Sequence, residues 1–473
     1  MSVMLIRPMT PTTSHTGIVS IQYPINIGYL VSYLKKHGIE CHVLDFEVEE
    51  FKEEFFIYKL NECKPEIVGF SCMTPHITAG GRLAGIVKKH FSDILTVAGG
   101  VHASAIPEKT LEEFAAFDVI VRGEGEATLR DLYHSWTKEH KLEGVEGIYY
   151  RENGNSVIKA NPSRLMIKDL DDIPFPDREL ADINLYKKSH VSRGFSRQTK
   201  NIAEIMGSRG CPYQCIFCAS QVVHTRNVRF RTPENIIEEM EHLINKYGAE
   251  HFSFLDDTFT IKRSILYNVC EYMRFKNVTF DCFTRVNDID EEKLKAMVNA
   301  GCKKVSFGIE SGSPKMLKLL KKGQTIEQIE RAFCLVKDAG IKTVEATFMI
   351  GNHPDETRED IEMTRKLIYR VRPDIMGIFI TIPYPGTELN RILKERGLLR
   401  DENWDEFKLL LGRHSWELGE IPMDELEKIL KNITNGYYLS LRYIVSTLMK
   451  IRNLYELKYW VRLGLSFVKA RFS

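Results

Sequence analysis

Three cysteines lie close together in the stretch GCPYQCIFC, which runs from residue 210 to residue 218. Cys211, Cys215 and Cys218 have C-x3-C-x2-C spacing, and no fourth cysteine is nearby. Closed structural zinc sites and ordinary iron–sulfur cubanes take four protein ligands. The spacing therefore predicts a metal centre in which the polypeptide leaves one coordination position to another group.

A zinc site is the alternative that the residues allow. It would need a fourth ligand, for which His224 is the nearest candidate, and the chain has no second C-x2-C pair. The cysteine loop follows the strand-like run AEIMGS and opens with Gly207 and Gly210, while Ile216 and Phe217 supply apolar cover against water. We therefore interpret the loop as an iron–sulfur site.

The elements ahead of this loop alternate between strand-like and helical patterns. Helical patterns such as NIGYLVSYLKKHG and ITAGGRLAGIVKKHF separate short apolar runs. This alternation predicts an α/β fold with a parallel, doubly wound sheet. The expected strands are VMLIRP (3–8), CHVLDF (41–46), EIVGFSC (66–72), ILTVAGG (94–100) and DVIVRG (118–123).

Small and hydroxylated residues follow these strands. The sequences at the expected carboxyl ends are MTPTTS, SCMTPH, GGVHAS and GEGEAT. Ligands of doubly wound sheets bind at this edge, and glycine allows the backbone to approach a large ligand closely. The same stretches are also compatible with plain tight turns.

A second β-α series begins near residue 202, after a predicted hairpin (147–160) and the proline-rich stretch LDDIPFPDREL (170–180). Its six strand candidates predict a partial parallel barrel, with chemistry at the strand carboxyl ends. The candidates are AEIMGS, HFSFLDD, VTFDCFTR, KVSFGIE, VEATFMIG and DIMGIFITIP. We expect domains at 1–145 and 196–400, a hairpin and linker at 146–195, and a helical region at 401–473.

Composition excludes several classes of protein. The chain has 473 residues, 43% of them hydrophobic and 27% charged, with a net charge of +1. Nucleic-acid binders usually carry a basic excess, so we expect no nucleic-acid partner. Met1 leads directly into a strand-like run, and no run of eighteen uncharged apolar residues occurs. These features predict a cytoplasmic protein with free or metal-bound thiols.

The cysteine loop resembles the signature of the radical S-adenosylmethionine superfamily, C-x3-C-x-aromatic-C, in which Phe217 matches the aromatic position. The resemblance implies that Cys211, Cys215 and Cys218 hold three irons of a [4Fe–4S] cluster. S-adenosylmethionine then chelates the fourth iron through its amino and carboxylate groups. Reductive cleavage of the sulfonium in this family yields a 5′-deoxyadenosyl radical, which abstracts hydrogen from carbon.

Other strand ends resemble further motifs of the same superfamily. The resemblance implies contacts to the methionine part at the end of the second strand, where this chain has LDDTF in place of the common GGE. KVSFGIESGS resembles the ribose-binding strand end, FMIGNHPDET the fifth-strand motif and IPYPGTEL the sixth-strand end. The S-adenosylmethionine contacts implied in this way are Phe217, Asp256, Asp257, Arg285, Glu310, Ser311 and Gly351.

The amino-terminal series resembles the cobalamin-binding domain of one subgroup of these enzymes. No histidine of the chain has an aspartate two residues before it, so the cobalt-ligating D-x-H-x-x-G motif is missing. His102 is more readily a hydrogen-bonding loop residue than a cobalt ligand. The alternative is a sheet retained without corrin. The implied cobalamin contacts are Ser71, Thr74, Gly99, Gly100, His102, Gly123, Glu124 and Gly125.

The carboxyl-terminal tail is aromatic and basic. Residues 431–473 contain eight Lys or Arg and one acid, Glu456. A basic amphipathic helix can lie on an anionic membrane surface. Alternatively, the tail forms helices that pack on the barrel and close the substrate cavity, with the Lys and Arg stems covering apolar surface.

The resemblance predicts a cobalamin-dependent radical enzyme that methylates an unactivated carbon. The layout of the whole chain also resembles anaerobic magnesium-protoporphyrin monomethyl-ester cyclases, so the alternative is oxidative or ring-forming chemistry on a tetrapyrrole or lipid-like substrate. The implied cofactors are a [4Fe–4S] cluster, S-adenosylmethionine and cobalamin. The implied partners are a small-molecule or lipid-like substrate and an electron donor such as flavodoxin or ferredoxin, and the tail adds a peripheral membrane contact as an open alternative.

Overall fold

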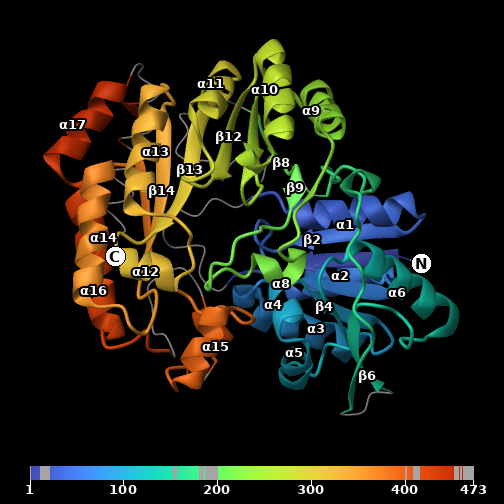
Figure 1. Cartoon of the computed structure of the whole chain (residues 1–473). Coiled ribbons are helices and arrows are strands. Elements are labelled where there is room, and N and C mark those ends of the chain that lie inside the picture. Colours follow the sequence, from blue (N-terminus) through green and yellow to red (C-terminus); the bar gives the residue numbers. More distant parts are fainter. Residues whose placement is uncertain are drawn as a thin grey trace.

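The computed structural model describes residues 2–10, 22–152, 157–180, 186, 201–399, 402–407, 416–451, 457–458 and 461. These residues form two large β-sheets, each with its own helices. The two sheet systems lie side by side in Figure 1, where the colours follow the sequence. The blue and teal half carries the first sheet, and the green to orange half carries the second. The predicted α/β class with two parallel sheet systems is confirmed.

The first sheet has the strand order β2-β1-β3-β4-β5-β6-β7. Its first five strands are parallel, and their 2-1-3-4-5 order is a common doubly wound arrangement whose switch point lies between β1 and β3. The expected strands therefore form. They are β1 (Ser2–Arg7), β2 (Glu40–Asp45), β3 (Ile67–Ser71), β4 (Leu95–Gly99) and β5 (Val119–Val121).

Helices cover both faces of this sheet because its strands are apolar on both sides. Val3 and Leu5 pack with residues of α1 and α6, whereas Met4 and Ile6 pack in the cluster that contains α2 and α3. The helices are α1 (Ile25–Lys36), α2 (Glu53–Cys63), α3 (Ile77–His90), α4 (Val101–Ala105), α5 (Pro107–Glu113) and α6 (Glu126–Glu139), and the short η1 (Thr74–His76) precedes α3.

The predicted hairpin forms as β6 (Ile148–Arg151) and β7 (Ile158–Ala160). Its strands pair antiparallel with β5 and with each other, so the hairpin extends the first sheet instead of standing apart from it. The proline-rich stretch that follows contains η3 (Leu170–Asp172), and its Arg178 is buried, donating to the Glu204 carbonyl at 2.7 Å. This linker is therefore packed into the fold.

The second sheet has the order β15-β14-β13-β12-β11-β8, and all neighbours are parallel. All six expected strands form, in chain order, as a partial barrel with β8 and β15 at its edges. The strands are β8 (Ile202–Ile205), β11 (His251–Phe254), β12 (Thr279–Thr284), β13 (Cys302–Glu310), β14 (Thr343–Ile350) and β15 (Ile375–Ile380). A two-stranded ribbon, β9 (Ser208–Arg209) and β10 (Arg229–Phe230), lies beside it.

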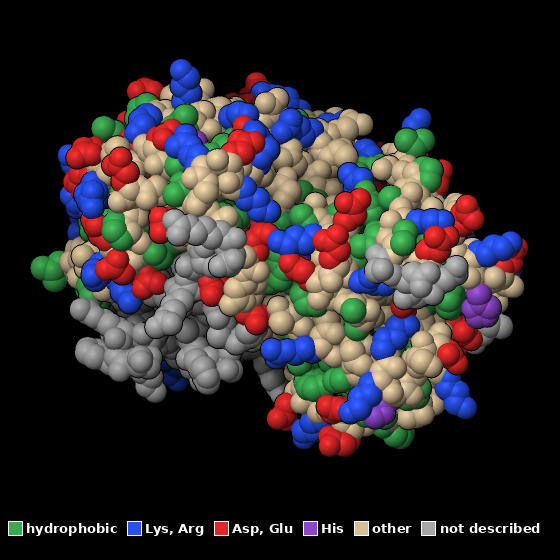
Figure 2. Space-filling view, turned by 90° about the horizontal axis from the view of Figure 1, so that it is seen from below, with side chains coloured by type: hydrophobic (Ala, Val, Ile, Leu, Met, Phe, Trp, Pro, Cys, Tyr) green, Lys and Arg blue, Asp and Glu red, His purple; other side chains and the backbone are tan. Residues whose placement is uncertain are grey.

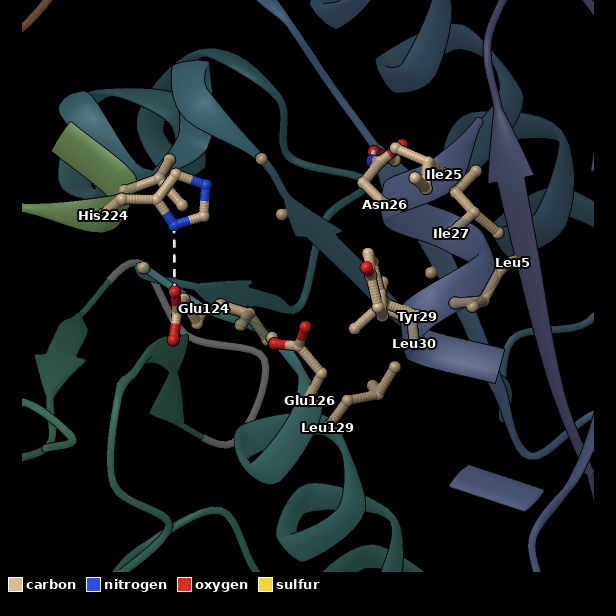
Figure 3. Close-up of a pocket in the computed structure, with 18 of the residues that line it drawn as sticks. Leu5, Ile25, Asn26, Ile27, Tyr29, Leu30, Glu124, Glu126, Leu129 and His224 are labelled. Atoms are coloured by element: carbon tan, nitrogen blue, oxygen red, sulfur yellow. Dashed lines mark hydrogen bonds and ion pairs between the residues drawn. The ribbon is translucent and has the colours of Figure 1, made fainter. Parts of the chain in front are cut away.

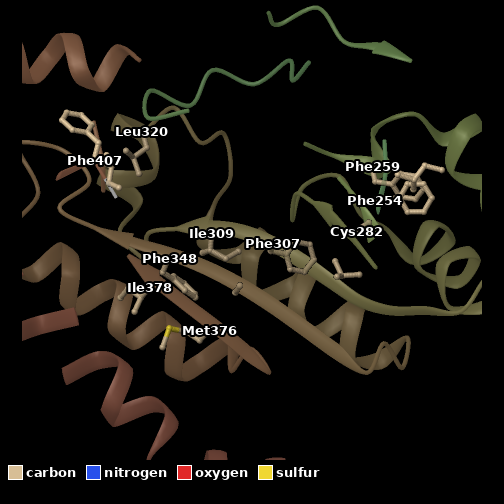
Figure 4. Packing of buried hydrophobic residues seen from close by; sticks show 14 of the residues in the cluster. Phe254, Phe259, Cys282, Phe307, Ile309, Leu320, Phe348, Met376, Ile378 and Phe407 are labelled. Atoms are coloured by element: carbon tan, nitrogen blue, oxygen red, sulfur yellow. The ribbon is translucent and has the colours of Figure 1, made fainter. Parts of the chain in front are cut away.

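The two faces of the second sheet differ in polarity. Along β14, Phe348 and its alternate neighbours are buried in the cluster shared with the helices, which Figure 4 shows for Phe254, Phe307 and Phe348. Three of the four intervening residues, Thr343, Glu345 and Thr347, are polar, and Glu345 accepts from Lys304 at 2.7 Å. The covering helices are α9 (Pro233–Tyr247), α10 (Arg263–Lys276), α11 (Glu291–Asn299), α12 (Pro314–Leu319), α13 (Ile326–Asp338), α14 (Arg358–Val371) and α15 (Glu388–Glu395), with η5 (Phe259–Ile261) before α10.

Two helices follow near the carboxyl end, at the far side of the second sheet in Figure 1. Tyr438 of α16 (Met423–Tyr438) accepts from the Met376 N–H at 2.9 Å and donates to its carbonyl at 2.7 Å, so α16 covers the edge strand β15. α17 (Leu441–Lys450) buries none of its residues. Among the described helices, none combines the length and apolar character needed to cross a bilayer.

The segment between the barrel and α16 returns to the first domain. η6 (Trp404–Glu406) contacts η1 and α3, and Trp404 Nε1 donates to Glu113 at 2.5 Å. On the face shown in Figure 2, Lys and Arg side chains are interspersed with Asp and Glu. Among the described residues, which Figure 2 draws in colour, that face shows no continuous basic stripe of the kind that tracks a nucleic-acid backbone.

Candidate active site

The cysteine loop is held at its base by the barrel. Asp256, which follows β11, accepts from the Gly207 N–H at 3.0 Å and from the Ser208 hydroxyl at 2.5 Å. The ribbon β9–β10 pairs residues on the two sides of the loop. Ile216 is buried at the middle of the loop, where its N–H donates to Leu320 and its carbonyl accepts from Leu389. Hydrogen bonds from the barrel and the ribbon therefore hold both ends and the middle of the loop.

The three thiols lie near one another at the surface of this loop. Burial raises the pKa of Cys218 to about 11, although the Ser220 N–H opposes the rise, and both Cys211 and Cys215 add to it. Burial also raises the pKa of Cys211, against a hydrogen bond from the Tyr213 backbone. The raised pKa values of Cys211 and Cys218 disfavour their thiolates, so binding of a cation favours the charged form of both.

Arg285 lies directly against the cysteine loop, after β12. Its Nη1 is 3.7 Å from Cys215 Sγ, its guanidinium carbon is 3.7 Å from the centre of the Tyr213 ring, and its Nη2 donates to the Lys322 carbonyl. A fixed cation beside a thiolate stabilises the negative charge of a sulfur-ligated cluster. The sequence predicted Arg285 near the bound cosubstrate, and the structure places it beside a cysteine sulfur.

Glu310 forms a buried ion pair at the end of β13. Its Oε1 is 2.8 Å from Lys322 Nζ, and both side chains are buried. Glu310 also has φ +70°, a left-handed conformation that a non-glycine residue rarely adopts and that is often found at functional sites. Lys322 Nζ lies 5.8 Å from the centre of the Phe217 ring. Glu310, Lys322, Phe217 and Arg285 thus surround the cysteine loop.

The two aspartates after β11 have different surroundings. Asp256 is fully used in anchoring the loop, and burial raises its pKa to about 6 despite the bonds from Ser208 and Gly207. Asp257 is exposed and accepts from Ser220 at 2.7 Å. Asp257 is therefore the one of the pair whose carboxylate is open to a ligand, while Asp256 supports the loop.

Two predicted contacts lie away from the thiols. Ser311 is buried, and its hydroxyl lies 3.1 Å from that of Thr364 on α14. Gly351 has φ +66°, and a Cβ there would meet Leu418 at 2.6 Å. The structure thus gives Ser311 and Gly351 packing roles, and their roles in binding S-adenosylmethionine stay predictions.

A cavity of about 270 Å³ lies between the cysteine loop and the first sheet. Its walls come from the carboxyl ends of β1, β3, β4 and β5, the start of α1, and α8 (Ser220–His224), which follows Cys218 (Figure 3). This is the switch-point edge at which doubly wound sheets bind ligands. Six of the eight predicted cobalamin contacts line it: Ser71, Gly99, Gly100, Gly123, Glu124 and Gly125.

The glycines leave room that side chains would fill. A Cβ at Gly99 would come no closer than 3.8 Å to its neighbours, and one at Gly123 no closer than 3.9 Å. At Gly100, by contrast, φ is +96° and a Cβ would meet the Cys72 carbonyl at 2.6 Å, so glycine is required by the backbone there. An apolar cavity with bare backbone on one wall fits part of a large, polar-rimmed cofactor such as cobalamin.

The two remaining contacts lie outside the cavity lining. Thr74 is buried in η1. His102 is buried against Trp404, with the ring centres 4.7 Å apart, and burial lowers its pKa to about 3. Neither ring nitrogen has a hydrogen-bond partner among the described residues. A neutral His102 therefore packs between the first domain and η6, and its contact with cobalamin stays a prediction.

The cavity also contains residues that the sequence did not single out. Asn26 and Tyr29 of α1 line it, as do Met206 and Arg209 before the cysteines. Lys322 near the thiols was missed as well. In the sequence, α1 has the pattern of an ordinary amphipathic helix. Its start lies near the cysteine loop only in the folded chain, where both contribute residues to the cavity. The strand-end sequences SCMTPH, GGVHAS and GEGEAT were the signals that pointed to this edge.

The arrangement suits a cluster better than a single metal ion. Among the described residues, no group of three or more His, Cys, Asp or Glu side chains converges to hold one metal. His224, the candidate fourth zinc ligand, binds Glu124 through Nδ1 at 2.9 Å. Three gathered thiols with a neighbouring cation and backbone donors can hold iron–sulfur corners, next to a cavity for a second cofactor.

Two family models match the chain. The model described as "Radical SAM superfamily" matches residues 205–368, and the "B12 binding domain" model matches residues 17–133. The first match contains the cysteine loop and most of the second sheet. The second contains the glycine-rich strand ends of the first sheet.

Curated relatives are similar along most of the chain. "Uncharacterized methyltransferase PH0819" of Pyrococcus horikoshii is 30% identical over 95% of each chain. The anaerobic magnesium-protoporphyrin IX monomethyl ester cyclase of Rubrivivax gelatinosus is 31% identical over 91% of this chain and 76% of its own. Both relatives therefore share the two-domain layout.

Solved structures share the fold. The cobalamin-dependent S-adenosylmethionine radical enzyme OxsB, with aqua-cobalamin and S-adenosylmethionine bound, superposes with a TM-score of 0.75 at 19% identity, over 98% of this chain and 70% of that chain. The radical S-adenosylmethionine methyltransferase TsrM of Kitasatospora setae, with cobalamin and a [4Fe–4S] cluster bound, gives 0.69 at 18% identity, over 85% and 76%. At such identities the likeness concerns the fold.

Proposed function

This chain belongs to the radical S-adenosylmethionine superfamily, in the subgroup with a B12-binding domain, and on that premise we propose that it methylates an unactivated carbon. One observation carries the proposal. Val223 and His224 of α8, a few residues after Cys218, line the glycine-walled cavity of the first domain. A cluster site and a second cofactor site therefore share one wall.

The cofactors of such an enzyme are a [4Fe–4S] cluster, S-adenosylmethionine and cobalamin. When bound, they supply a low-potential electron, a cleavable sulfonium and a methyl carrier. We propose that the three cysteines bind the cluster and that Asp257, Arg285 and Glu310 orient S-adenosylmethionine. The glycines of the cavity bind cobalamin through their backbone, and the apolar walls exclude water from the reacting centre.

Side chains beside the cysteines then have defined tasks. The cation of Arg285, at 3.7 Å from Cys215 Sγ, offsets thiolate charge and can pair with a carboxylate of the cosubstrate. Glu310 can accept from ribose hydroxyls, and Lys322 holds it in place through the ion pair at 2.8 Å. Asp257 offers an exposed carboxylate to the cosubstrate's ammonium group.

The second candidate function is an oxidative or ring-forming radical reaction. It is favoured by the similarity to the Rubrivivax gelatinosus cyclase over 91% of this chain. The two functions differ in how they use S-adenosylmethionine. Methyl transfer consumes two molecules, one giving S-adenosylhomocysteine and one giving 5′-deoxyadenosine, whereas the cyclase-like reaction gives 5′-deoxyadenosine alone.

Anaerobic reconstitution tests the proposal. Protein loaded with iron, sulfide and hydroxocobalamin is incubated with reductant, methyl-labelled S-adenosylmethionine and a small-molecule extract. Equal release of S-adenosylhomocysteine and 5′-deoxyadenosine, with label in a new product, supports methylation. Release of 5′-deoxyadenosine without S-adenosylhomocysteine supports the cyclase-like alternative, and release of neither contradicts both.

The partners of a radical enzyme are a small-molecule substrate and a reductant. We propose a lipid-like or tetrapyrrole substrate and a small flavodoxin- or ferredoxin-type electron donor in the cytoplasm. We further propose a peripheral contact with an anionic membrane surface through α17, which exposes Leu441 and Met449 beside the cations Arg442 and Lys450. Vesicle binding tests the membrane contact.

A further inference from the structure

A buried group of charged side chains joins the cavity to the cysteine loop. Glu124 lies between two glycines at the cavity wall (Figure 3) and belongs to the first domain. Its partners Arg209, His224 and Arg229 belong to the second. The side chains of Glu124 and the two arginines are each at least nine-tenths buried. The contact therefore ties the two domains together at the site.

The contacts reach the cysteine loop from both of its ends. Arg209 lies two residues before Cys211, and its Nη1 is 3.4 Å from Glu124 Oε1. His224 ends the helix that follows Cys218, and its Nδ1 is 2.9 Å from the same oxygen. Arg229 donates to Glu124 Oε2 at 2.9 Å and also contacts Oε1. One carboxylate thus touches the entry and the exit of the loop.

The ribbon β9–β10 joins the two ends of the cysteine loop. Arg209 and Arg229 are direct neighbours across the ribbon, so the loop between them leaves and returns at one point. Arg209 also donates to Glu126 at 2.7 Å and lies over the Tyr29 ring at 5.1 Å, and both of these residues line the cavity. Two arginines and two glutamates balance in charge, which makes their burial tolerable.

We infer that Glu124 is a positioning residue that couples occupancy of the interdomain cavity to retention of the cluster by the cysteine loop. A ligand that fills the cavity fixes the glycine-flanked backbone that carries Glu124. The fixed carboxylate then holds both ends of the loop, so iron leaves more slowly. Where the slower loss reflects tighter binding of the cluster at equilibrium, linkage requires that the assembled cluster also strengthens binding in the cavity. This inference rests on the proposed function, because it takes cobalamin as the ligand.

The experiment measures iron loss, which does not depend on turnover. Anaerobically reconstituted wild-type protein, with and without hydroxocobalamin, is mixed with an iron chelator, and the release of iron is followed by absorbance. Cobalamin should slow release by about fivefold or more, the usual lower range of coupling between two sites. In Glu124→Gln, which loses the charge that holds both ends of the loop, release should be the same with and without cobalamin.

Two further variants separate coupling from simple destabilisation. Glu425→Gln removes an exposed ion pair with Arg358, away from the cavity, and should keep the full protection. His224→Gln removes the least buried partner of Glu124 and should weaken the protection even if Glu124→Gln fails to fold. A residue with a merely structural role would speed iron loss equally in both conditions.

The outcomes distinguish the inference from the function on which it rests. If wild-type protein shows no corrin absorbance after gel filtration, both the cobalamin part of the proposed function and the inference are wrong. If corrin binds and wild-type iron loss is unchanged by it, the inference alone is wrong. Protection that survives in both Glu124→Gln and His224→Gln also overturns it.

Discussion

Burial raises the pKa of Cys211 above its usual range and that of Cys218 to about 11, so a bound cation would favour both thiolates. Their neighbours are arranged for that charge: Arg285 lies beside Cys215 Sγ, and backbone N–H groups of Tyr213 and Ser220 point to the other two sulfurs. The thiols, the Arg285 cation and the backbone N–H groups together therefore favour binding of a metal cation by the thiolates.

Replacing Cys215 with alanine should abolish cluster assembly, because two thiols cannot hold the cubane. Iron content and absorbance after anaerobic reconstitution should fall to background, and no 5′-deoxyadenosine should form. Cys334→Ala is the matched control, since Cys334 is exposed on α13 and should leave iron content unchanged. Normal iron content in Cys215→Ala would contradict the assignment of the loop.

Asp256 should make the chain less stable as pH rises. Burial raises the pKa of Asp256 from its ordinary value of 3.8 to about 6 in the folded chain. The resulting stabilisation of the folded state is fully present below pH 3.8 and is lost as the pH rises through 6. Between pH 5 and pH 8 the loss is on the order of 1 kcal/mol. In Asp256→Asn, chemical denaturation at the two pH values should show a pH difference smaller by that amount. An unchanged difference would contradict a raised pKa.

Individual site residues were predictable to different degrees. The cysteines carry their signal in their spacing, and Arg285 was implied by the resemblance of its strand end to the superfamily. Lys322 does not, because a lysine in KKGQT looks like a solvated turn residue, and its ion pair with Glu310 forms only in the folded chain. Ser311 was picked by motif, yet its hydroxyl is turned toward Thr364, a direction that sequence does not encode.

Strands and helices follow the sequence pattern more closely than side-chain roles do. All eleven expected strands form, because apolar, β-branched runs bounded by turns leave few other solutions. The pairing of the hairpin with β5 was not visible, since a hairpin's own pattern does not say which edge it joins. The pleat of β14 divides its residues between the helices and the polar face, as Figure 4 illustrates for Phe348.

The sequence left two alternatives open for the tail, packing on the barrel or contact with a membrane surface, and the two tail helices differ in which one they fit. α16 packs on the barrel edge, where Tyr438 satisfies both backbone groups of Met376. α17 packs little of its surface: Leu441 and Met449 are each 81% exposed, and the helix contains no acid. The packing alternative thus describes α16, and the exposed face of α17 is the part suited to a membrane surface.

α17 should bind vesicles that contain phosphatidylglycerol more tightly than vesicles of phosphatidylcholine alone. The double variant Leu441→Ser, Met449→Ser should bind at least about tenfold more weakly, since each buried side chain is worth about 1.5 kcal/mol or more. Leu165→Ser, at another exposed leucine, is the control and should bind normally. Equal sedimentation with both vesicle types would contradict an electrostatic contribution.

At the scale of the molecule, one hydrophobic cluster joins the two domains, and the segment after the barrel adds further contacts between them. Glu402 contacts Lys109 of the first domain and lies 3.0 Å from Lys394 of the second. Trp404 is buried between His102 and Phe407. Such a return of the chain to the first domain has no sequence signature, since residues far apart in sequence meet only in the finished fold.

Trp404→Ala should destabilise the whole protein by about 3–5 kcal/mol, the usual effect of removing a large buried aromatic ring. Trp404→Phe keeps most of the packing and loses the bond to Glu113, so it should cost about 1 kcal/mol. Chemical denaturation followed by circular dichroism gives both values. Equal stability of Trp404→Ala and wild type would show that η6 does not fasten the domains.

The sequence pattern separates two β-α series, yet one hydrophobic cluster of the folded chain contains residues of both sheets, such as Phe70 and Phe348. The limits set at 145, 195 and 400 stay predictions. The hairpin belongs with the first sheet, and Arg178 of the linker is bonded to Glu204 and Glu239, so the boundary is a packed surface. A linker of prolines and acids gives no hint of such packing, since its partners come from the other half of the chain.

The closed base of the cysteine loop has a consequence for how the enzyme is matured. Backbone pairing of β9 with β10 joins the two ends of the loop, and these bonds involve protein groups alone. We therefore expect the apoprotein to complete its fold before iron is inserted. The cluster would then be inserted into a protein that has already folded. A zinc finger differs, because its folding depends on its ion. Oxygen damage that strips the iron should leave an intact scaffold, which the cell can reload instead of degrading.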